Sequence, residues 1–272
     1  MSAAFPNKYR SYIRKVQQSD DYFGFDVRAL ARIEPILKFL HDDWWRVNSE
    51  GFERLPETGP ALIVSNASGV IPWVALMLIY SLMVEKKNCR RVNIVTDMSW
   101  IENAGLRTAL LEIGFVPWSS DNVKRLLSKG ELLAMFPEYP GSVGKSWSMK
   151  NRVSEFDWTK FLSAIEANAK IFPLATLGCD EAPATFFNAE SLSKALKLSA
   201  FPVSPFFPWL PFPFNLASLP ISWSMNLLPA IEYQVGKKRH DIEECAKRQA
   251  LFAEGEIQAE LNRMLRMRHR VF

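Results

Sequence analysis

The sequence predicts an α/β fold in which a mostly parallel sheet is flanked by helices. The first observation is a series of short runs rich in branched apolar residues, which is typical of buried strands. The second is that segments with helical apolar spacing lie between these runs, as expected for strand–helix–strand units. We expect strands at residues 61–64, 91–96, 115–118, 131–136, 171–176 and 221–228, and helices at residues 74–80, 106–113, 122–129, 156–169 and 241–268.

The length of 272 residues and the apolar content of 48% suit one large domain with its own core. We assign residues 1–47 to an N-terminal amphipathic helical region that caps the fold, and residues 48–272 to the α/β domain. Cysteines are few and widely spaced, without a CxxC pair, so we expect reduced thiols, no disulfide, no metal site and no cofactor.

The helix of the N-terminal region begins after Asp26, a suitable N-cap, and extends to about residue 40. Pro35 lies inside it and is predicted to kink it or to divide it in two. Two tryptophans, Trp44 and Trp45, follow. The helix either packs on the surface of the α/β domain or faces a membrane with the tryptophans at the level of the headgroups.

Charge and hydropathy favour a peripheral position. Lys and Arg number 33 against 29 Asp and Glu, a mild excess that suits an anionic membrane surface; we expect no nucleic-acid partner. The longest apolar run, residues 70–84, is shorter than the roughly 20 residues that a membrane span needs and contains Pro72. Residues 1–15 lack the apolar core of a signal peptide. We therefore expect a cytoplasmic protein that lies on the inner face of the cell membrane.

Residues 201–214 differ from the rest of the chain, because prolines alternate with aromatic side chains. The prolines prevent a regular ladder, so these aromatics do not belong to one element. They either form a lid over the sheet or an apolar rim that enters lipid.

Small residues form the turn between the strand at 61–64 and the helix at 74–80. Asn66, Ala67, Ser68 and Gly69 make this turn, at the end of a strand where binding and catalytic groups collect in open α/β sheets. No Asp, Glu, His, Lys, Arg or Cys occurs between Glu57 and Glu85. The turn has the position of an active site without any group that titrates.

A second constellation follows the strand at 131–136. Glu138 and Tyr139 come directly after it, and Lys145, Lys150 and Arg152 lie within the next 14 residues. These cations could hold an anionic headgroup or phosphate, or they could be solvated cations of a polar loop. The loop lacks the full GxxxxGK[ST] pattern, so we do not expect nucleotide binding.

Together these stretches resemble the glycerolipid acyltransferase superfamily, the family of lysophosphatidate acyltransferases, and in particular its branch of mono- and diacylglycerol acyltransferases. The resemblance covers the chain from about Asp21 to Phe272. It is carried by the sequences GPALIVSN at 59–66, FPE at 136–138 and IFPLA at 171–175. It implies a glycerol-3-phosphate acyltransferase-like fold and transfer of an acyl group from acyl-CoA or acyl carrier protein to a lysolipid hydroxyl.

The chain departs from the family at the catalytic motif, NHxxxxD or NHSG followed by PxD. There the imidazole takes a proton from the acceptor hydroxyl and the carboxylate orients the ring. Here Asn66, Ser68 and Gly69 are kept, but Ala67 stands in place of the histidine. The acid position falls on Pro72, Trp73 or Val74, depending on the spacing. In the family's FPEG motif, Tyr139 replaces the glycine.

Three hypotheses follow. The first is a catalytically degenerate member that binds an acyl chain, acyl carrier or lipid, or supports a partner enzyme. The second is an active acyltransferase with another base, for which His41 is a better choice than His240 or His269; Ser65 or Ser68 would be a nucleophile without a partner base visible in the sequence. The third is a membrane-associated scaffold that binds protein through its aromatic segment.

Overall fold

The computed structural model describes residues 12–13, 22–69, 71–84, 90–99, 101, 103–138, 145, 147–183, 187–189, 191, 202–204, 209, 218–236 and 238–268.

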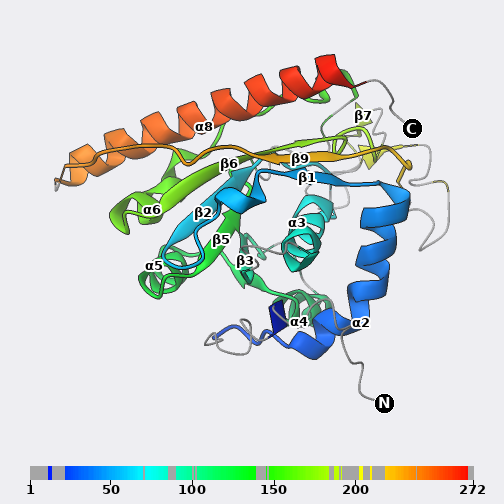
Figure 1. Ribbon diagram of the computed structural model, residues 1–272, viewed down its shortest axis with the longest axis horizontal. Coiled ribbons are helices and arrows are strands. Elements are labelled where there is room, and N and C mark those ends of the chain that lie inside the picture. Colours follow the sequence, from blue (N-terminus) through cyan, green and yellow to red (C-terminus); the bar gives the residue numbers. More distant parts are fainter. Residues whose placement is uncertain are drawn as a thin grey trace.

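The centre of the protein is a seven-stranded sheet of order β1-β9-β6-β2-β5-β3-β4 (Figure 1). Neighbouring strands run parallel, except for β6 and β9, which are antiparallel. The predicted α/β class with a mostly parallel sheet is therefore confirmed. The strands are β1 Asn48–Glu50, β2 Ala61–Ser65, β3 Val92–Thr96, β4 Phe115–Pro117, β5 Leu132–Met135, β6 Lys170–Leu177 and β9 Ser224–Leu227.

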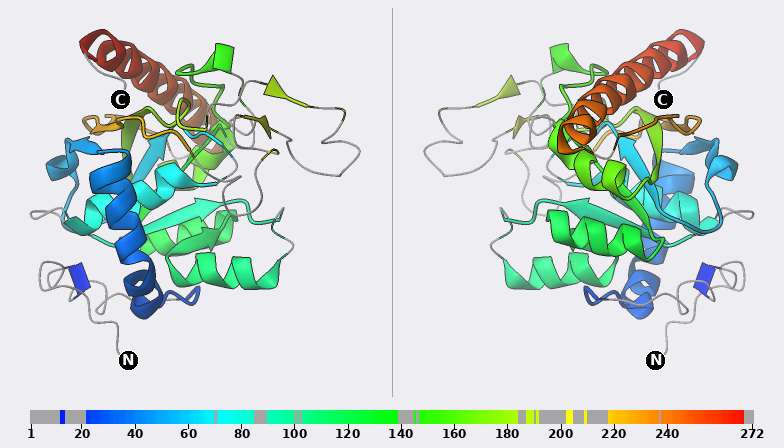
Figure 2. Two further views of the ribbon diagram at one scale, coloured as in Figure 1. Left: turned by 90° about the vertical axis from the view of Figure 1, so that its right-hand side faces the viewer. Right: turned by 90° about the vertical axis from the view of Figure 1, so that its left-hand side faces the viewer.

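Helices cover both faces of the sheet, as the two views of Figure 2 show. Alternate residues of β2 belong to two separate apolar cores: Ala61 and Ile63 to one, Leu62 and Val64 to the other. Because side chains alternate along a strand, a strand that is apolar at every position must be covered on both sides. The first core includes α2 Val27–Lys38 and α3 Trp73–Val84, with α4 Ala104–Glu112 packed against it, and the second includes α5 Ser120–Ser128, α6 Leu162–Glu166 and α8 Arg239–Met267.

The helix starts follow from local capping chemistry. The carboxylate of Asp26 accepts a hydrogen bond from the backbone N–H of Arg28 at 2.8 Å, as predicted from its position before α2. Asn103 and Ser119 cap α4 and α5 in the same way. Each cap satisfies a backbone donor that the first turn of a helix leaves unpaired.

Pro35 does not divide the N-terminal helix. It lies inside α2, which continues directly into the π-helix η2 Phe39–Trp44. The wider π turn is a usual way for a helix to absorb an irregularity, and it ends at Trp45. The helix predicted at 156–169 is also different, since it consists of the 3₁₀-helix η5 Trp158–Phe161 followed by the short α6.

Trp45 belongs to the core and does not face a membrane. Its side chain is fully buried, stacks on Trp223 at 4.5 Å between ring centroids and meets Trp73 edge-on at 5.3 Å. Its indole N–H donates to the carbonyl of Leu219. The membrane-facing alternative is thus wrong for Trp45, because a tryptophan stacked between segments of the chain is unavailable to lipid. The strand β1, which follows it, was not predicted.

Most of the aromatic segment 201–214 lies outside the described residues. Within it, the two-residue strand β8 Pro202–Val203 pairs with β7 Phe187–Asn188. The choice between a lid and a lipid-facing rim therefore stays a prediction. In the part of the chain that the structure describes, no helix has the length and apolar character needed to cross a membrane.

Candidate active-site loop

Three loops meet at the carboxyl ends of neighbouring parallel strands. The turn Asn66–Gly69 follows β2, Glu138 follows β5, and the segment 178–183 follows β6. Because β2 lies between β5 and β6 in the sheet, the turn is the middle one of the three. This is the edge of an open α/β sheet at which ligands usually bind.

Asn66 holds the turn to the strand β6. Its side-chain amide donates to the carbonyl of Thr176 at 2.9 Å, and its side-chain carbonyl accepts from the N–H of Thr176, also at 2.9 Å. The same amide lies 3.4 Å from the sulfur of Cys179. Asn66 is almost fully buried and its side-chain amide is hydrogen-bonded, so it is a structural anchor of the turn.

Glu138 holds the turn from the other side. One carboxylate oxygen accepts from the N–H of Ala67 at 2.6 Å, and the other accepts from the N–H of Ser154 at 2.7 Å. Burial raises the pKa of Glu138, and the nearby Lys145 ammonium partly opposes this rise. Glu138 therefore joins the turn to the loop after β5.

Lys145 points inward and joins two buried carboxylates. Its ammonium lies 3.5 Å from Glu138 and 3.7 Å from Asp180, and it donates to the carbonyl of Arg152 at 2.9 Å. Burial alone would lower the pKa of Lys145, but Asp180 and Glu138 outweigh burial, so the pKa is raised. With its charge already compensated, Lys145 is not the free headgroup ligand that its sequence position suggested.

Asp180 was absent from the predicted site residues. Its side chain is 4% exposed, and one oxygen, Oδ2, accepts from the N–H of Asn151 at 2.8 Å. Burial raises the pKa of Asp180, while Lys145 and the hydroxyl of Ser68 favour its ionised form. The position of Asp180 directly beyond β6 was the available signal, since the same reasoning had singled out Glu138 beyond β5.

An apolar cavity begins at the turn and runs between α3, β3 and α4. It encloses about 50 Å³. No residue of α4, its outer wall, is fully buried, so this wall is the loosely packed side of the cavity. The cavity is lined by Ala67, Ser68, Gly69, Pro72, Val74, Ala75, Ile94, Thr96, Ile101, Leu110, Phe115 and Phe136.

The three positions offered for the missing acid separate in space. Pro72 and Val74 line the cavity together with Ala67, whereas Trp73 packs against Trp45. A carboxylate that oriented an imidazole at position 67 would therefore have to stand at position 72 or, with the PxD spacing, at position 74. All three positions are apolar in this chain.

His41 does not serve the turn. Its ring is buried, contacts Tyr80 and uses both nitrogens, Nδ1 with Asp42 at 2.8 Å and Nε2 with Ser81 at 3.1 Å. Ser81 lies eight residues beyond the start of α3, or about 12 Å along the helix at 1.5 Å per residue. This placement argues against His41 as the base at the turn. The burial of its ring also shows that His41 is not a surface residue. His240 is exposed at the start of α8, and His269 lies outside the described residues.

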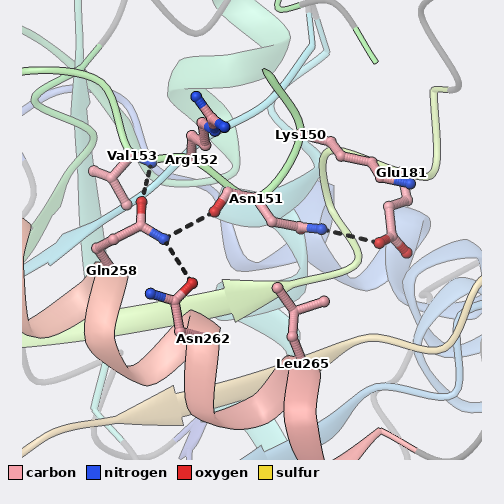
Figure 3. Close-up of a pocket in the computed structure, with 8 residues that line it drawn as sticks. All are labelled: Lys150, Asn151, Arg152, Val153, Glu181, Gln258, Asn262 and Leu265. Carbon is pink, nitrogen blue, oxygen red and sulfur yellow. Dashed lines mark hydrogen bonds between the residues drawn. The ribbon is translucent and has the colours of Figure 1, made fainter. Parts of the chain in front are cut away.

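Two of the remaining predicted residues, Lys150 and Arg152, line a polar groove beside α8 (Figure 3). Tyr139 lies outside the described residues. The amide of Gln258 accepts from the N–H of Val153 at 2.8 Å and donates to the carbonyl of Asn151 at 3.0 Å. These bonds fix the loop that carries the cations to the C-terminal helix. Among the described residues no group of three or more His, Cys, Asp or Glu could hold a metal ion.

Comparisons with known proteins identify a matching family model and similar relatives. Residues 46–177 match the family model described as Acyltransferase, a range that includes the turn and Glu138. An uncharacterized protein of Mycobacterium tuberculosis is 32% identical over 207 residues, which is 75% of this chain and 58% of the relative. An uncharacterized protein of Mycobacterium leprae is 33% identical over 205 residues, 75% of this chain and 56% of the relative. The chain thus spans somewhat more than half the length of these relatives.

A solved structure has the same fold. It is the 1-acyl-sn-glycerophosphate acyltransferase PlsC from Thermotoga maritima, with a TM-score of 0.51, 12% identity, and coverage of 92% of this chain and 88% of that chain. At this identity the likeness concerns the fold alone, and the family match concerns residues 46–177. Together they support the resemblance to the glycerolipid acyltransferase superfamily.

Proposed function

We propose that this protein binds an acyl group, carried by a lipid, by coenzyme A or by acyl carrier protein, and that it has lost the direct acyl transfer of its family. The observation that carries the proposal is the apolar cavity that opens at Ala67, the position of the missing histidine. Apolar pockets with a few polar groups at one end are typical ligand sites. Here the polar end is the turn with Ser68.

The loss of transfer follows from what surrounds Ala67. General-base catalysis contributes roughly 10²- to 10⁴-fold to such reactions, and it needs a base within hydrogen-bond reach of the acceptor hydroxyl. His41 is occupied elsewhere, and Val74 supplies no carboxylate. The frame of the active-site loop persists because Asn66 and Glu138 hold it, and neither of these bonds depends on position 67 having a side chain that titrates.

The loop between β5 and η5 supports a peripheral position on the inner face of the cell membrane, which we include in the proposal. Trp147 and Met149 are exposed apolar side chains in this loop, and Lys150 and Arg152 follow them. Exposed aromatic and cationic side chains together suit the interface of an anionic membrane. A lipid surface would supply the ligand, and a partner enzyme could use the bound acyl group.

Binding and transfer can be tested separately. A fluorescent fatty acyl-CoA or lysolipid should bind the full chain, and Leu110→Trp, which narrows the cavity from α4, should weaken binding at least tenfold. Leu251→Trp is the matched control, because Leu251 is 69% exposed on α8. Acyl transfer from the thioester to lysolipid or glycerol acceptors should stay at background. Equal binding by Leu110→Trp would contradict the cavity as the acyl site, and multiple turnovers of transfer would contradict the loss of activity.

A further inference from the structure

The segment after β6 packs along the whole turn. At one end Asn66 contacts the sulfur of Cys179, and at the other end Pro183 lies next to Gly69, with 4.0 Å between its Cγ and the position of a Cβ at Gly69. Ser68 and Asp180 lie between these two contacts. Burial raises the pKa of Asp180, and the Lys145 ammonium and a hydrogen bond from Ser68 oppose this rise.

One oxygen of Asp180 is unexplained by the rest of the cluster. Oδ2 is held by Asn151 and faces Lys145, but Oδ1 is buried and accepts no hydrogen bond within the described part of the chain. A buried acceptor without a partner is rare, and such groups often belong to functional sites. Ser68, on the turn against which this segment packs, itself lines the apolar cavity.

We propose that Ser68 is a nucleophile that takes the acyl group from a bound acyl thioester, with Asp180 as its base. The inference rests on the proposed function, because the cavity must first hold the acyl chain. An acyl group whose first carbons enter the cavity would bring its carbonyl carbon to the turn, beside Ser68. The sequence had offered this serine without a partner base, and the fold supplies Asp180 from 112 positions further along the chain.

The step is balanced without any further reactant. The Asp180 carboxylate accepts the proton of the Ser68 hydroxyl as Oγ attacks the thioester carbonyl carbon. The new C–O bond forms, the C–S bond breaks, and the leaving thiolate takes the proton back from Asp180. The products are acyl-Ser68 and a free thiol, and the carboxylate is regenerated.

The surroundings suit this chemistry. The helix α3, of 12 residues, begins at Trp73, four positions after Gly69, and the partial positive charge at the N-terminal end of a helix favours the negative charge that develops on the carbonyl oxygen. Burial raises the pKa of Asp180, and the nearby Lys145 ammonium opposes this rise and so favours the ionised form that acts as base. Burial raises the pKa of Cys179 well above its ordinary value, so this neighbouring thiol stays protonated and is a poor competitor.

The test is single-turnover acylation of the full chain with palmitoyl-CoA, followed by intact mass and peptide mapping. We expect one acyl group per chain on Ser68 and one equivalent of thiol released. Ser68→Ala should abolish the label, and Asp180→Asn, which keeps the shape and the bond to Asn151, should slow it about 100-fold or more. Ser65→Ala is the matched control, because Ser65 is also buried at the end of β2 but donates to the carbonyl of Asn66.

The outcomes separate this inference from the proposed function. Normal binding of the acyl-CoA without any label, or with the label on Cys179 or Cys245, overturns Ser68 as nucleophile and leaves the binding function standing. Asp180→Asn with wild-type kinetics overturns Asp180 as base. Absence of binding overturns both proposals. If Ser68→Ala should fail to fold, Ser68→Cys replaces it, and the expected label then becomes a thioester that neutral hydroxylamine removes.

Discussion

Two polar networks are buried in this protein, and they differ in what they leave open. Around His41 every partner is accounted for: Asp42 and Ser81 take the two ring nitrogens, and Ser81 also bonds to Ser49 of β1 at 2.9 Å. Around Asp180, the carboxylate oxygen Oδ1 accepts no hydrogen bond within the described residues, and Ser68 of the neighbouring turn lines a cavity. A closed network fixes the position of the helical cap, whereas an incomplete one at a sheet edge fits binding or chemistry.

The largest effect should come from opening the cluster at the turn. Glu138→Ala leaves Lys145 buried without one of its two carboxylates and removes the acceptor of two backbone N–H groups. We expect a loss of about 3–5 kcal/mol in the free energy of unfolding, measured by urea denaturation. Glu166→Ala is the control, since it breaks the exposed pair with Lys124 and should cost less than about 1 kcal/mol. Equal losses in the two variants would show that the Glu138 cluster is not a stabilising unit.

The closed network should affect stability alone. His41→Ala removes the bond to Ser81 and the ring contact with Tyr80, and we expect a loss of about 1–3 kcal/mol. Binding of the acyl probe should not change. The exposed His240→Ala serves as control, with both quantities at wild-type values. A large loss of acyl binding in His41→Ala, at a temperature where the variant is folded, would contradict the separation of the two networks.

The pH dependence of stability should distinguish the networks by sign. Burial lowers the pKa of His41, although Asp42 opposes this, so the folded chain binds the proton less readily than the unfolded chain. The contribution of His41 is therefore present above the unfolded pKa of about 6.5 and falls as the pH drops through and below that value. His41→Gln should flatten this fall in denaturation curves recorded between pH 7 and pH 5.

The carboxylates at the turn act in the opposite direction. Burial raises the pKa of both Glu138 and Asp180, so their contribution to stability is largest below their unfolded pKa values and declines as the pH rises through the raised ones. The difference between wild type and His41→Gln isolates the histidine from these groups. A difference that does not vary with pH would contradict a depressed His41 pKa.

The smallest effect should come from restoring the histidine. Ala67→His alone should give no measurable transfer from acyl-CoA to a lysolipid, because Val74 leaves the ring without a carboxylate to orient it. The comparison is sharpened by Ala67→His with Val74→Asp, which supplies both groups on the wall of one cavity. Transfer by the single variant at the rate of the double variant would show that orientation by an acid is dispensable here.

Much of the fold could be predicted because its strands are apolar at successive positions and its helices are capped by recognisable residues. Glu138 could also be predicted, since its place at the end of a strand follows from strand boundaries alone. The direction of the Lys145 side chain could not be predicted. A lysine seven positions after a glutamate gives no sign of whether its ammonium faces solvent or a second carboxylate. The second carboxylate, Asp180, lies 35 positions further along the chain.

Trp45 shows the same limit in the apolar part of the chain. A tryptophan pair flanked by charges fits a membrane interface and a core equally well, and the partner that decides between them, Trp223, comes from the other end of the sequence. Asp180 is a different case, because its position just beyond β6 follows from strand boundaries in the same way as the position of Glu138 beyond β5. The pairing of Ser68 with Asp180 needed the order of strands, which no local pattern contains.

The side chain of Asn66 has one more consequence. The register of β2 and β6 ends with Ser65 opposite Leu174, and beyond it the amide of Asn66 both donates to and accepts from the backbone of Thr176, as another strand residue would. The side chain of Asn66 thereby extends the hydrogen bonding between β2 and β6 beyond Ser65. The loop owes its shape to this pairing and to the bond between Glu138 and the N–H of Ala67, and neither depends on the side chain at position 67.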